Sequence, residues 1–135
     1  MKNIIACDDE KRDLSLLDRE VHKVLPDCSM QTFLSASDAV TYALDCRKRK
    51  IDIDLAFINV SISGVRGVEL AESLRGVFPE IAIVYTVENP DFTQRQNWDV
   101  TLCKPISVLE LGNVLDKVIG VSGKGSRMIV PNTVR

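Results

Sequence analysis

Five polar side chains that could take part in chemistry stand at or just after the ends of short apolar runs: Asp8, Asp9, Asn59, Thr86 and Lys104. Adjacent carboxylates are ligands that Mg²⁺ favours, and a lysine ammonium forms strong hydrogen bonds with carboxylates. Asn59 carries an amide, whose nitrogen lone pair is delocalised, so this side chain is a poor nucleophile. The chemistry of the chain therefore depends on whether the fold gathers these groups around a residue that is not an acid.

The apolar runs have the length of strands and little alternation with polar residues. The strands expected on this basis cover residues 3–7, 28–34, 54–58, 81–85 and 100–103. Within it, Leu55 to Ile58 form an unbroken apolar run that ends at Asn59, which is typical of a strand buried on both faces of a sheet.

Stretches with apolar residues at helical spacing separate these strands. The helices are expected at 14–25, from Ser35 to about Lys50, at about 67–78 and from Ser107 to Ile119. Ser35 with Asp38, and Ser107 with Glu110, resemble capping boxes that begin two of them. The segment 89–97 is polar and weakly periodic, so a fourth helix there is expected to be short or irregular.

Regular alternation of strands and helices predicts an α/β fold, with a doubly wound, five-stranded parallel sheet covered by helices on both faces. Ligands of such sheets bind beyond the carboxyl ends of the strands. The polar residues that follow the strands are therefore expected to collect at one edge of the sheet.

The length and composition of the chain limit the classes of protein to consider. It has 135 residues, 45% hydrophobic and 27% charged, and a net charge of -2. One domain is expected, with no basic field that would draw it to nucleic acid and no apolar run long enough to span a bilayer. The four cysteines form no CxxC pair, so buried free thiols in a cytoplasmic protein are expected.

The chain resembles the receiver domain of bacterial two-component response regulators. The resemblance rests on the acid pair Asp8-Asp9, on Asn59 after the third strand, on Thr86 after the fourth and on Lys104-Pro105 after the fifth. The resemblance covers residues 1–120 and leaves 121–135 as a linker or tail. It implies a flavodoxin-like (βα)5 fold with strand order 2-1-3-4-5. In that family an aspartate at the end of strand three accepts a phosphoryl group from a histidine kinase. By position, Asp8 and Asp9 match the Mg²⁺-binding acids, Thr86 the switch hydroxyl, and Lys104 the lysine that pairs with the acceptor.

The chain departs from the pattern of the family at four positions. Asn59 stands where the family has its acceptor aspartate, and Thr101 stands where an aromatic switch residue is usual. Ser63 replaces a frequent proline and Arg66 an acid. Without the third carboxylate we expect no cofactor beyond weak Mg²⁺ binding at Asp8 and Asp9. Asn59 is expected to donate its amide hydrogens to one of these acids.

These departures favour an atypical receiver that works without phosphorylation. It would be a protein–protein interaction module in signalling or transcriptional control, and not an enzyme. Self-association is expected through the face formed by helix four, strand five and helix five. The linker at 121–126, followed by the apolar residues 128–130, suggests either an output domain in a longer parent chain or a tail that packs back on the domain.

Two other functions remain open at this point. The chain could be an ordinary phosphoacceptor receiver in which Asn59 is an engineered substitution, although Ser63, Arg66 and Thr101 argue against it. It could also be a flavodoxin-like cofactor enzyme. Such an enzyme needs a phosphate-binding loop after strand one, where this chain has Asp8-Asp9-Glu10.

Single residues also have simpler interpretations. The segment Asp8-Asp9-Glu10 would suit the start of a helix by its charge alone, and Thr86 could be an ordinary turn residue. His22 is expected to be a solvated surface residue. Ser61 and Ser63 lack an adjacent base that would make either of them a substitute acceptor. Trp98 is expected either to be half-buried or to anchor an interface.

Overall fold

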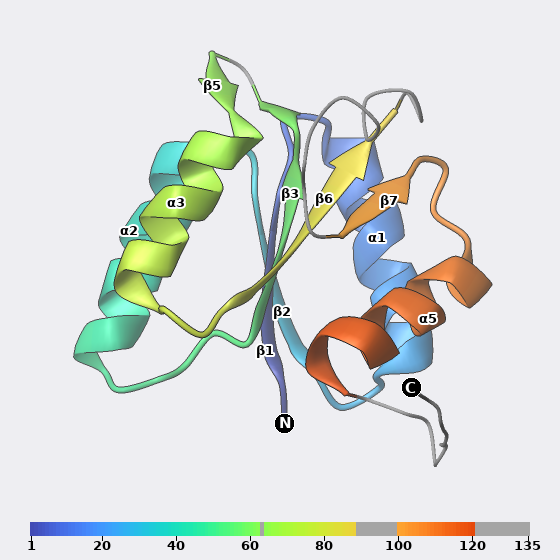
Figure 1. The fold of residues 1–135 in the computed structure, drawn as a ribbon, viewed down its shortest axis with the longest axis horizontal. Coiled ribbons are helices and arrows are strands. Elements are labelled where there is room, and N and C mark those ends of the chain that lie inside the picture. Colours follow the sequence, from blue (N-terminus) through green and yellow to red (C-terminus); the bar gives the residue numbers. More distant parts are fainter. Residues whose placement is uncertain (63, 89–99, 121–135) are drawn as a thin grey trace.

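The computed structural model describes residues 1–62, 64–88 and 100–120. A five-stranded, wholly parallel sheet runs in the order β2-β1-β3-β6-β7 (Figure 1). Its strands are β1 (Asn3–Cys7), β2 (Ser29–Phe33), β3 (Leu55–Asn59), β6 (Ala82–Val87) and β7 (Thr101–Cys103). In chain order this is the predicted order 2-1-3-4-5, so the doubly wound flavodoxin-like fold is confirmed.

Helices cover both faces of the sheet. The described helices are α1 (Lys11–Val24), α2 (Ala36–Lys48), α3 (Gly67–Val77) and α5 (Val108–Ile119). Helices α2 and α3 lie on one face, and α1 and α5 lie on the other (Figure 1). The fourth helix expected at 89–97 falls outside the described residues. No helix in the described ranges is long and apolar enough to cross a membrane.

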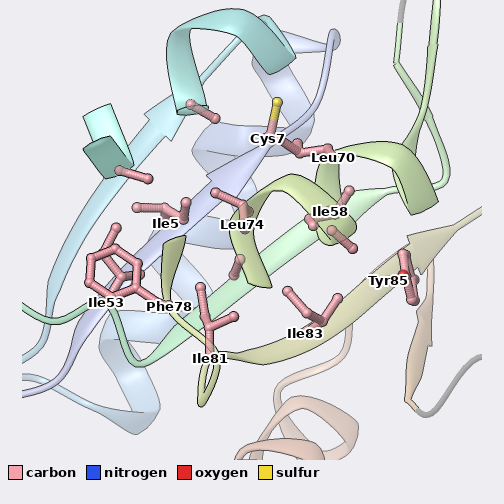
Figure 2. Packing of buried hydrophobic residues seen from close by; sticks show 14 of the residues in the cluster. Ile5, Cys7, Ile53, Ile58, Leu70, Leu74, Phe78, Ile81, Ile83 and Tyr85 are labelled. Atoms are coloured by element: carbon pink, nitrogen blue, oxygen red, sulfur yellow. The ribbon is translucent and has the colours of Figure 1, made fainter. Parts of the chain in front are cut away.

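Each face of the sheet has its own apolar core. On the α2/α3 face, Ile5 and Ile58 from the strands pack in one cluster with Leu70 and Leu74 from α3 (Figure 2). On the α1/α5 face, Leu14 and Leu17 of α1 cluster with Phe57 and with the buried leucines of α5. Every residue of β3 is buried, as its unbroken apolar run predicts. The strand that carries Asn59 is therefore held on both faces.

The two predicted helix starts are confirmed in detail. The Oγ atom of Ser35 accepts a hydrogen bond from the Asp38 backbone N–H, and Ser107 Oγ does the same for Glu110, each at 3.1 Å. Each bond satisfies a backbone donor that lacks a partner within the helix. The start of α5, and with it the segment after β7, is fixed by this local chemistry.

Several boundaries differ from those expected. Strand β2 is one residue shorter at each end than 28–34, and β7 begins at Thr101. Strand β6 continues to Val87, so Thr86 lies inside the strand and not after it. Apolar runs mark where a strand is buried, whereas hydrogen bonding to the neighbouring strand decides where it ends.

The structure contains a small hairpin between β3 and α3 that the sequence pattern did not predict. Strands β4 (Ser61–Ile62) and β5 (Val65–Arg66) pair in antiparallel orientation, and Gly64 between them has φ 73°. Two-residue strands are too short to produce a periodic pattern. Gly67 then begins α3 directly against β3: a Cβ there would lie 2.4 Å from the Asn59 carbonyl oxygen. The hairpin and this glycine hold the chain close to the end of β3.

Candidate functional site

Asn59 and Thr86 lie side by side at the carboxyl edge of the sheet, because β3 and β6 pair with these two residues in register. Both are buried, with 6% and 4% of their surface exposed. The backbone oxygen of Thr86 accepts a hydrogen bond from the Val60 N–H at 3.1 Å. This bond fixes the turn after β3 against β6. The sheet therefore brings these two polar residues together at its carboxyl edge, as the sequence predicts.

Asp8 is the centre of the site. It is 5% exposed, and its two carboxylate oxygens accept three hydrogen bonds. Oδ1 accepts from the Glu10 backbone N–H at 2.9 Å. Oδ2 accepts from Asn59 Nδ2 at 3.0 Å and from Lys104 Nζ at 2.8 Å. A buried carboxylate needs such partners, and here the protein itself supplies all of them.

The amide of Asn59 has a fixed orientation. Its Oδ1 accepts the Ser61 backbone N–H at 2.9 Å, while its Nδ2 donates to Asp8. Exchanging the oxygen and nitrogen would place acceptor against acceptor and donor against donor. The expected donation from Asn59 to one of the two acids is confirmed, with Asp8 as the acceptor.

Lys104 connects the site to α1 through Asp13. Its Nζ lies 2.7 Å from Asp13 Oδ2, as well as 2.8 Å from Asp8 Oδ2 and 3.9 Å from Glu88 Oε2. Burial lowers the pKa of the Lys104 ammonium, but its hydrogen bonds to Asp13 and Asp8 and their charges outweigh burial, so the pKa is raised above its ordinary value. The ammonium is thus held in its charged form by two carboxylates.

Sequence reasoning missed Asp13. It lies in the first turn of α1, where an acid also suits the helix dipole, so its type alone gave no reason to single it out. Its contact with Lys104 joins residues 91 positions apart, and no local pattern in the sequence indicates such a contact.

The fit of this donor set to Mg²⁺, the ion that the resemblance implies, is poor. The oxygens of Asp8 already accept hydrogen bonds, and one of them holds the Lys104 ammonium. The acceptor position supplies a neutral amide, and Asp9 is exposed. Within the described ranges, no three His, Cys, Asp or Glu side chains are grouped to hold a metal ion. In this arrangement Lys104 supplies the positive charge that a metal would otherwise bring.

The remaining predicted residues are more distant from this chemistry. Thr101 is half-buried on β7, where it pairs in register with Tyr85 and not with Thr86. Arg66 is on β5 and forms an exposed ion pair with Glu69 at 3.2 Å. Ser63 and Trp98 lie outside the described residues. The structure therefore joins Asp8, Asn59 and Lys104 directly and places Thr86 beside them.

His22 lies at the surface as predicted, with its side chain 40% exposed, but its ring also makes contacts that the sequence did not predict. Its Nδ1 lies 3.0 Å from the Asp18 carbonyl oxygen and 2.9 Å from Asp18 Oδ1, and its Nε2 lies 3.2 Å from the Cys28 carbonyl oxygen. All three neighbours are acceptors, so both ring nitrogens must carry hydrogen for every contact to form. The ring thereby ties the end of α1 to the segment that enters β2.

The expected burial of the cysteines holds for some of them only, because Cys28 and Cys103 are half-buried. All four are free thiols, and Cys7 and Cys46 are buried. Burial, followed by the nearby charges of Asp8 and Asp9, raises the pKa of the Cys7 thiol to about 12. A thiol with such a pKa remains protonated and unreactive at neutral pH.

Solved structures with the same arrangement of elements are response-regulator receivers. A two-component transcriptional regulator AraC from Clostridium phytofermentans has a TM-score of 0.73 at 19% identity, over 89% of this chain and 94% of that one. The response regulator TrrA from Thermotoga maritima, in complex with Mg²⁺-BeF, has a TM-score of 0.70 at 20% identity, over 87% of this chain and 99% of that one. A CheY-like receiver domain protein from Methanospirillum hungatei gives 0.65 at 16% identity, over 89% and 95%.

This chain has the receiver fold. No family model matches the sequence, and no curated protein matches it either. At identities of 20% or less the likeness is one of fold. What the site does must therefore be argued from its own side chains.

Proposed function

We propose that this chain is an atypical receiver module that works without phosphorylation, through protein–protein contacts in signalling or transcriptional control. The observation that supports the proposal is the state of Asn59. The residue at the acceptor position is an amide with both polar atoms engaged, one by Asp8 and the other by the Ser61 backbone. The fold of the receiver is kept, while the group that would carry the phosphoryl is replaced.

The chemistry of phosphoryl transfer requires a nucleophilic oxygen at this position. A carboxylate can attack phosphorus and form an acyl phosphate, whereas a carboxamide is neutral and poorly nucleophilic. Lys104, which would pair with the acceptor in the receiver family, is held by Asp8 and Asp13 in this chain. Both Asn59, at the acceptor position, and Lys104, the usual cationic partner of an acceptor, thus make structural contacts.

The proposed partner surface is the face formed by β7, α5 and the helix expected at 89–97, which lies outside the described residues, with a second copy as one partner. On α5, Leu109 is 76% exposed and Val108 40% exposed, which gives this face an apolar element that a partner could cover. A module of this kind would act in the cytoplasm and would not itself bind nucleic acid. An output domain would follow it in a longer parent chain.

An ordinary phosphoacceptor receiver with a substituted acceptor is the second candidate. It is favoured by the retention of Asp8, Asp9, Thr86 and Lys104. This second function does not explain why Asp13 binds Lys104, or why a threonine stands at position 101.

Intact mass after incubation with acetyl phosphate and Mg²⁺ tests the proposal. The unaltered chain is expected to keep its mass, because no side chain at the acceptor position can form an acyl phosphate. Asn59→Asp is the matched variant, since it restores the nucleophile beside an otherwise unchanged site. An adduct of phosphoryl mass on the unaltered chain would contradict the proposal.

A further inference from the structure

A pocket of about 480 Å³ opens on the α1 side of the Lys104 contacts. Its lining shares Asp8, Thr86 and Lys104 with the site described above and adds Asp13, but it includes neither Asn59 nor Asp9, so the pocket adjoins the acceptor position and extends away from it along α1. Leu14, Leu17 and Phe57 of its lining belong to the core on the α1/α5 face, and the two helices lie together on that face (Figure 1). Pockets of this volume are typical of sites for small organic molecules.

The two ends of the pocket differ in chemistry. One end is polar, with the Lys104 ammonium among the carboxylates of Asp8, Asp13 and Glu88. The rest of the lining is mostly apolar and includes Leu14, Leu16, Leu17, Phe57, Pro105 and Ile106, with the oppositely charged Arg19 and Glu20 of α1 also part of it. Leu16 is 41% exposed, so part of this apolar wall faces solvent. A ligand that filled the pocket would need an apolar body and a polar group at one end.

The net charge of the polar end determines whether the polar group of a ligand there should be a cation or an anion. Three carboxylates face one ammonium there, and Lys104 is within hydrogen-bond distance of two of them. Farther along α1, Glu20 already accepts hydrogen bonds from Arg19 and Lys23. The polar end therefore has an excess of negative charge. Asp8 and Asp13 are mostly buried, where a charge is screened less than at the surface, whereas the side chain of Glu88 is 79% exposed. An anionic ligand would be repelled and a cationic one attracted.

We propose that this pocket binds a small amphipathic organic cation, with its ammonium group at Asp13 and Glu88 and its apolar body along α1 and Ile106. An organic ammonium satisfies both ends of the pocket at once, whereas a bare metal ion would leave the apolar wall without a partner. The inference goes beyond the function proposed above and does not depend on it, because the pocket would be present whether or not Asn59 excludes phosphorylation.

A series of probes that differ only in the head group tests the charge preference. Octylamine, octanoate and octanol are titrated into the unaltered protein, with calorimetry for affinity and amide NMR shifts for location. Octylamine is expected to bind saturably and to shift residues that line the pocket, such as Leu14 and Ile106. Octanol should bind more weakly and octanoate weakest. Equal binding of octylamine and octanoate, or shifts confined to other parts of the protein, would overturn the proposal.

Two substitutions separate the contributions of the two ends. Asp13→Asn removes a charge at nearly constant shape and is expected to weaken octylamine about tenfold or more, while leaving octanol nearly unchanged. Leu16→Ser should weaken both probes by similar factors, because it shortens the apolar wall. Leu44→Ser, at an exposed leucine of α2 that does not line the pocket, is the matched control and should change neither.

Two further outcomes would also decide against the proposal. If Asp13→Asn binds octylamine as tightly as the unaltered protein, the carboxylate does not select the cation. If Mg²⁺ alone produces the shifts of octylamine and competes with it, the polar end is a metal site. Should Asp13→Asn fail to fold, the head-group series on the unaltered protein still decides the question of charge.

Discussion

The Lys104 ammonium and the Asp13 carboxylate lie 2.7 Å apart and join residues that are 91 positions apart in the sequence. One belongs to the segment after the edge strand β7, and the other to the first turn of α1. Asp8 shares the same ammonium at 2.8 Å. The contact ties an edge strand of the sheet to the helix that follows β1. Because Lys104 binds Asp13 and Asp8, its ammonium is not free to pair with a group at the acceptor position.

The two carboxylates are expected to contribute unequally to stability. The side chain of Asp8 is 6% exposed and that of Asp13 27% exposed. Asp8→Asn removes the charge that compensates a buried ammonium and disturbs the bond to Asn59, so a loss of roughly 2–4 kcal/mol in the free energy of unfolding is expected. Asp13→Asn leaves Lys104 with Asp8 and should cost about 1–2 kcal/mol. Urea denaturation of both variants checks the order, and a larger loss for Asp13→Asn would contradict it.

The tight passage from β3 into α3 predicts opposite effects for two glycines of the same helix. A Cβ at Gly67 would lie 2.4 Å from the Asn59 carbonyl oxygen, whereas a Cβ at Gly76 would meet nothing within 4 Å. Gly67→Ala is expected to destabilise the protein by about 2 kcal/mol or more, because backbone atoms must move. Gly76→Ala should stabilise it by about 0.5–1 kcal/mol through helix propensity. Thermal melting of the two variants is the measurement. A Gly67→Ala variant as stable as the parent would show that α3 can shift away from β3.

His22 predicts a pH dependence of stability. The hydrogen bond to the Asp18 carbonyl raises the pKa of His22; partial burial opposes this, and the bond to the Cys28 carbonyl and the charge of Asp18 add to it. A histidine with a raised pKa in the folded state contributes stability that is fully present below its unfolded pKa, about 6.5. That contribution is lost as the pH rises through the folded pKa.

The change expected from His22 is below about 1 kcal/mol, because its side chain is 40% exposed. Urea midpoints measured from pH 5 to pH 9 should therefore fall slightly on the alkaline side for the parent protein. In His22→Gln, which removes the titrating ring, this part of the pH dependence should be absent. An unchanged pH profile in the variant would exclude the contribution.

The sequence predicted those features that depend on local patterns. The apolar runs located the five strands of the sheet, and Ser35 and Ser107 located two helix starts. Polar residues at strand ends located Asp8, Asn59 and Lys104, because parallel strands bring their carboxyl ends to one edge. The amide at position 59 also predicted its donation to an acid, since a buried amide must find an acceptor.

What the sequence did not predict depends on contacts between distant segments or on elements too short to leave a pattern. Asp13 looks like an ordinary acidic residue at a helix start until β7 brings Lys104 beside it. His22 lies on the polar side of α1, and its role appears only when the segment before β2 supplies the Cys28 carbonyl. The β4–β5 hairpin has two residues in each strand, which is too few for any periodicity to be detected.

Restoring the acceptor should make the stability of the protein depend on Mg²⁺. Asn59→Asp would place a carboxylate next to Asp8, where the amide now donates a hydrogen bond at 3.0 Å. Without metal, the lost bond and the repulsion between like charges are expected to cost about 1–2 kcal/mol, partly offset by Lys104. With Mg²⁺ the two carboxylates and Asp9 can share a cation, so the midpoint of thermal unfolding should rise with Mg²⁺ concentration. The parent protein, whose Asp8 is satisfied by Asn59 and Lys104, should show little change in the same titration. A Mg²⁺-dependent rise in the parent as large as in the variant would mean that Lys104 yields its place to the metal readily, and that the amide does not prevent metal binding.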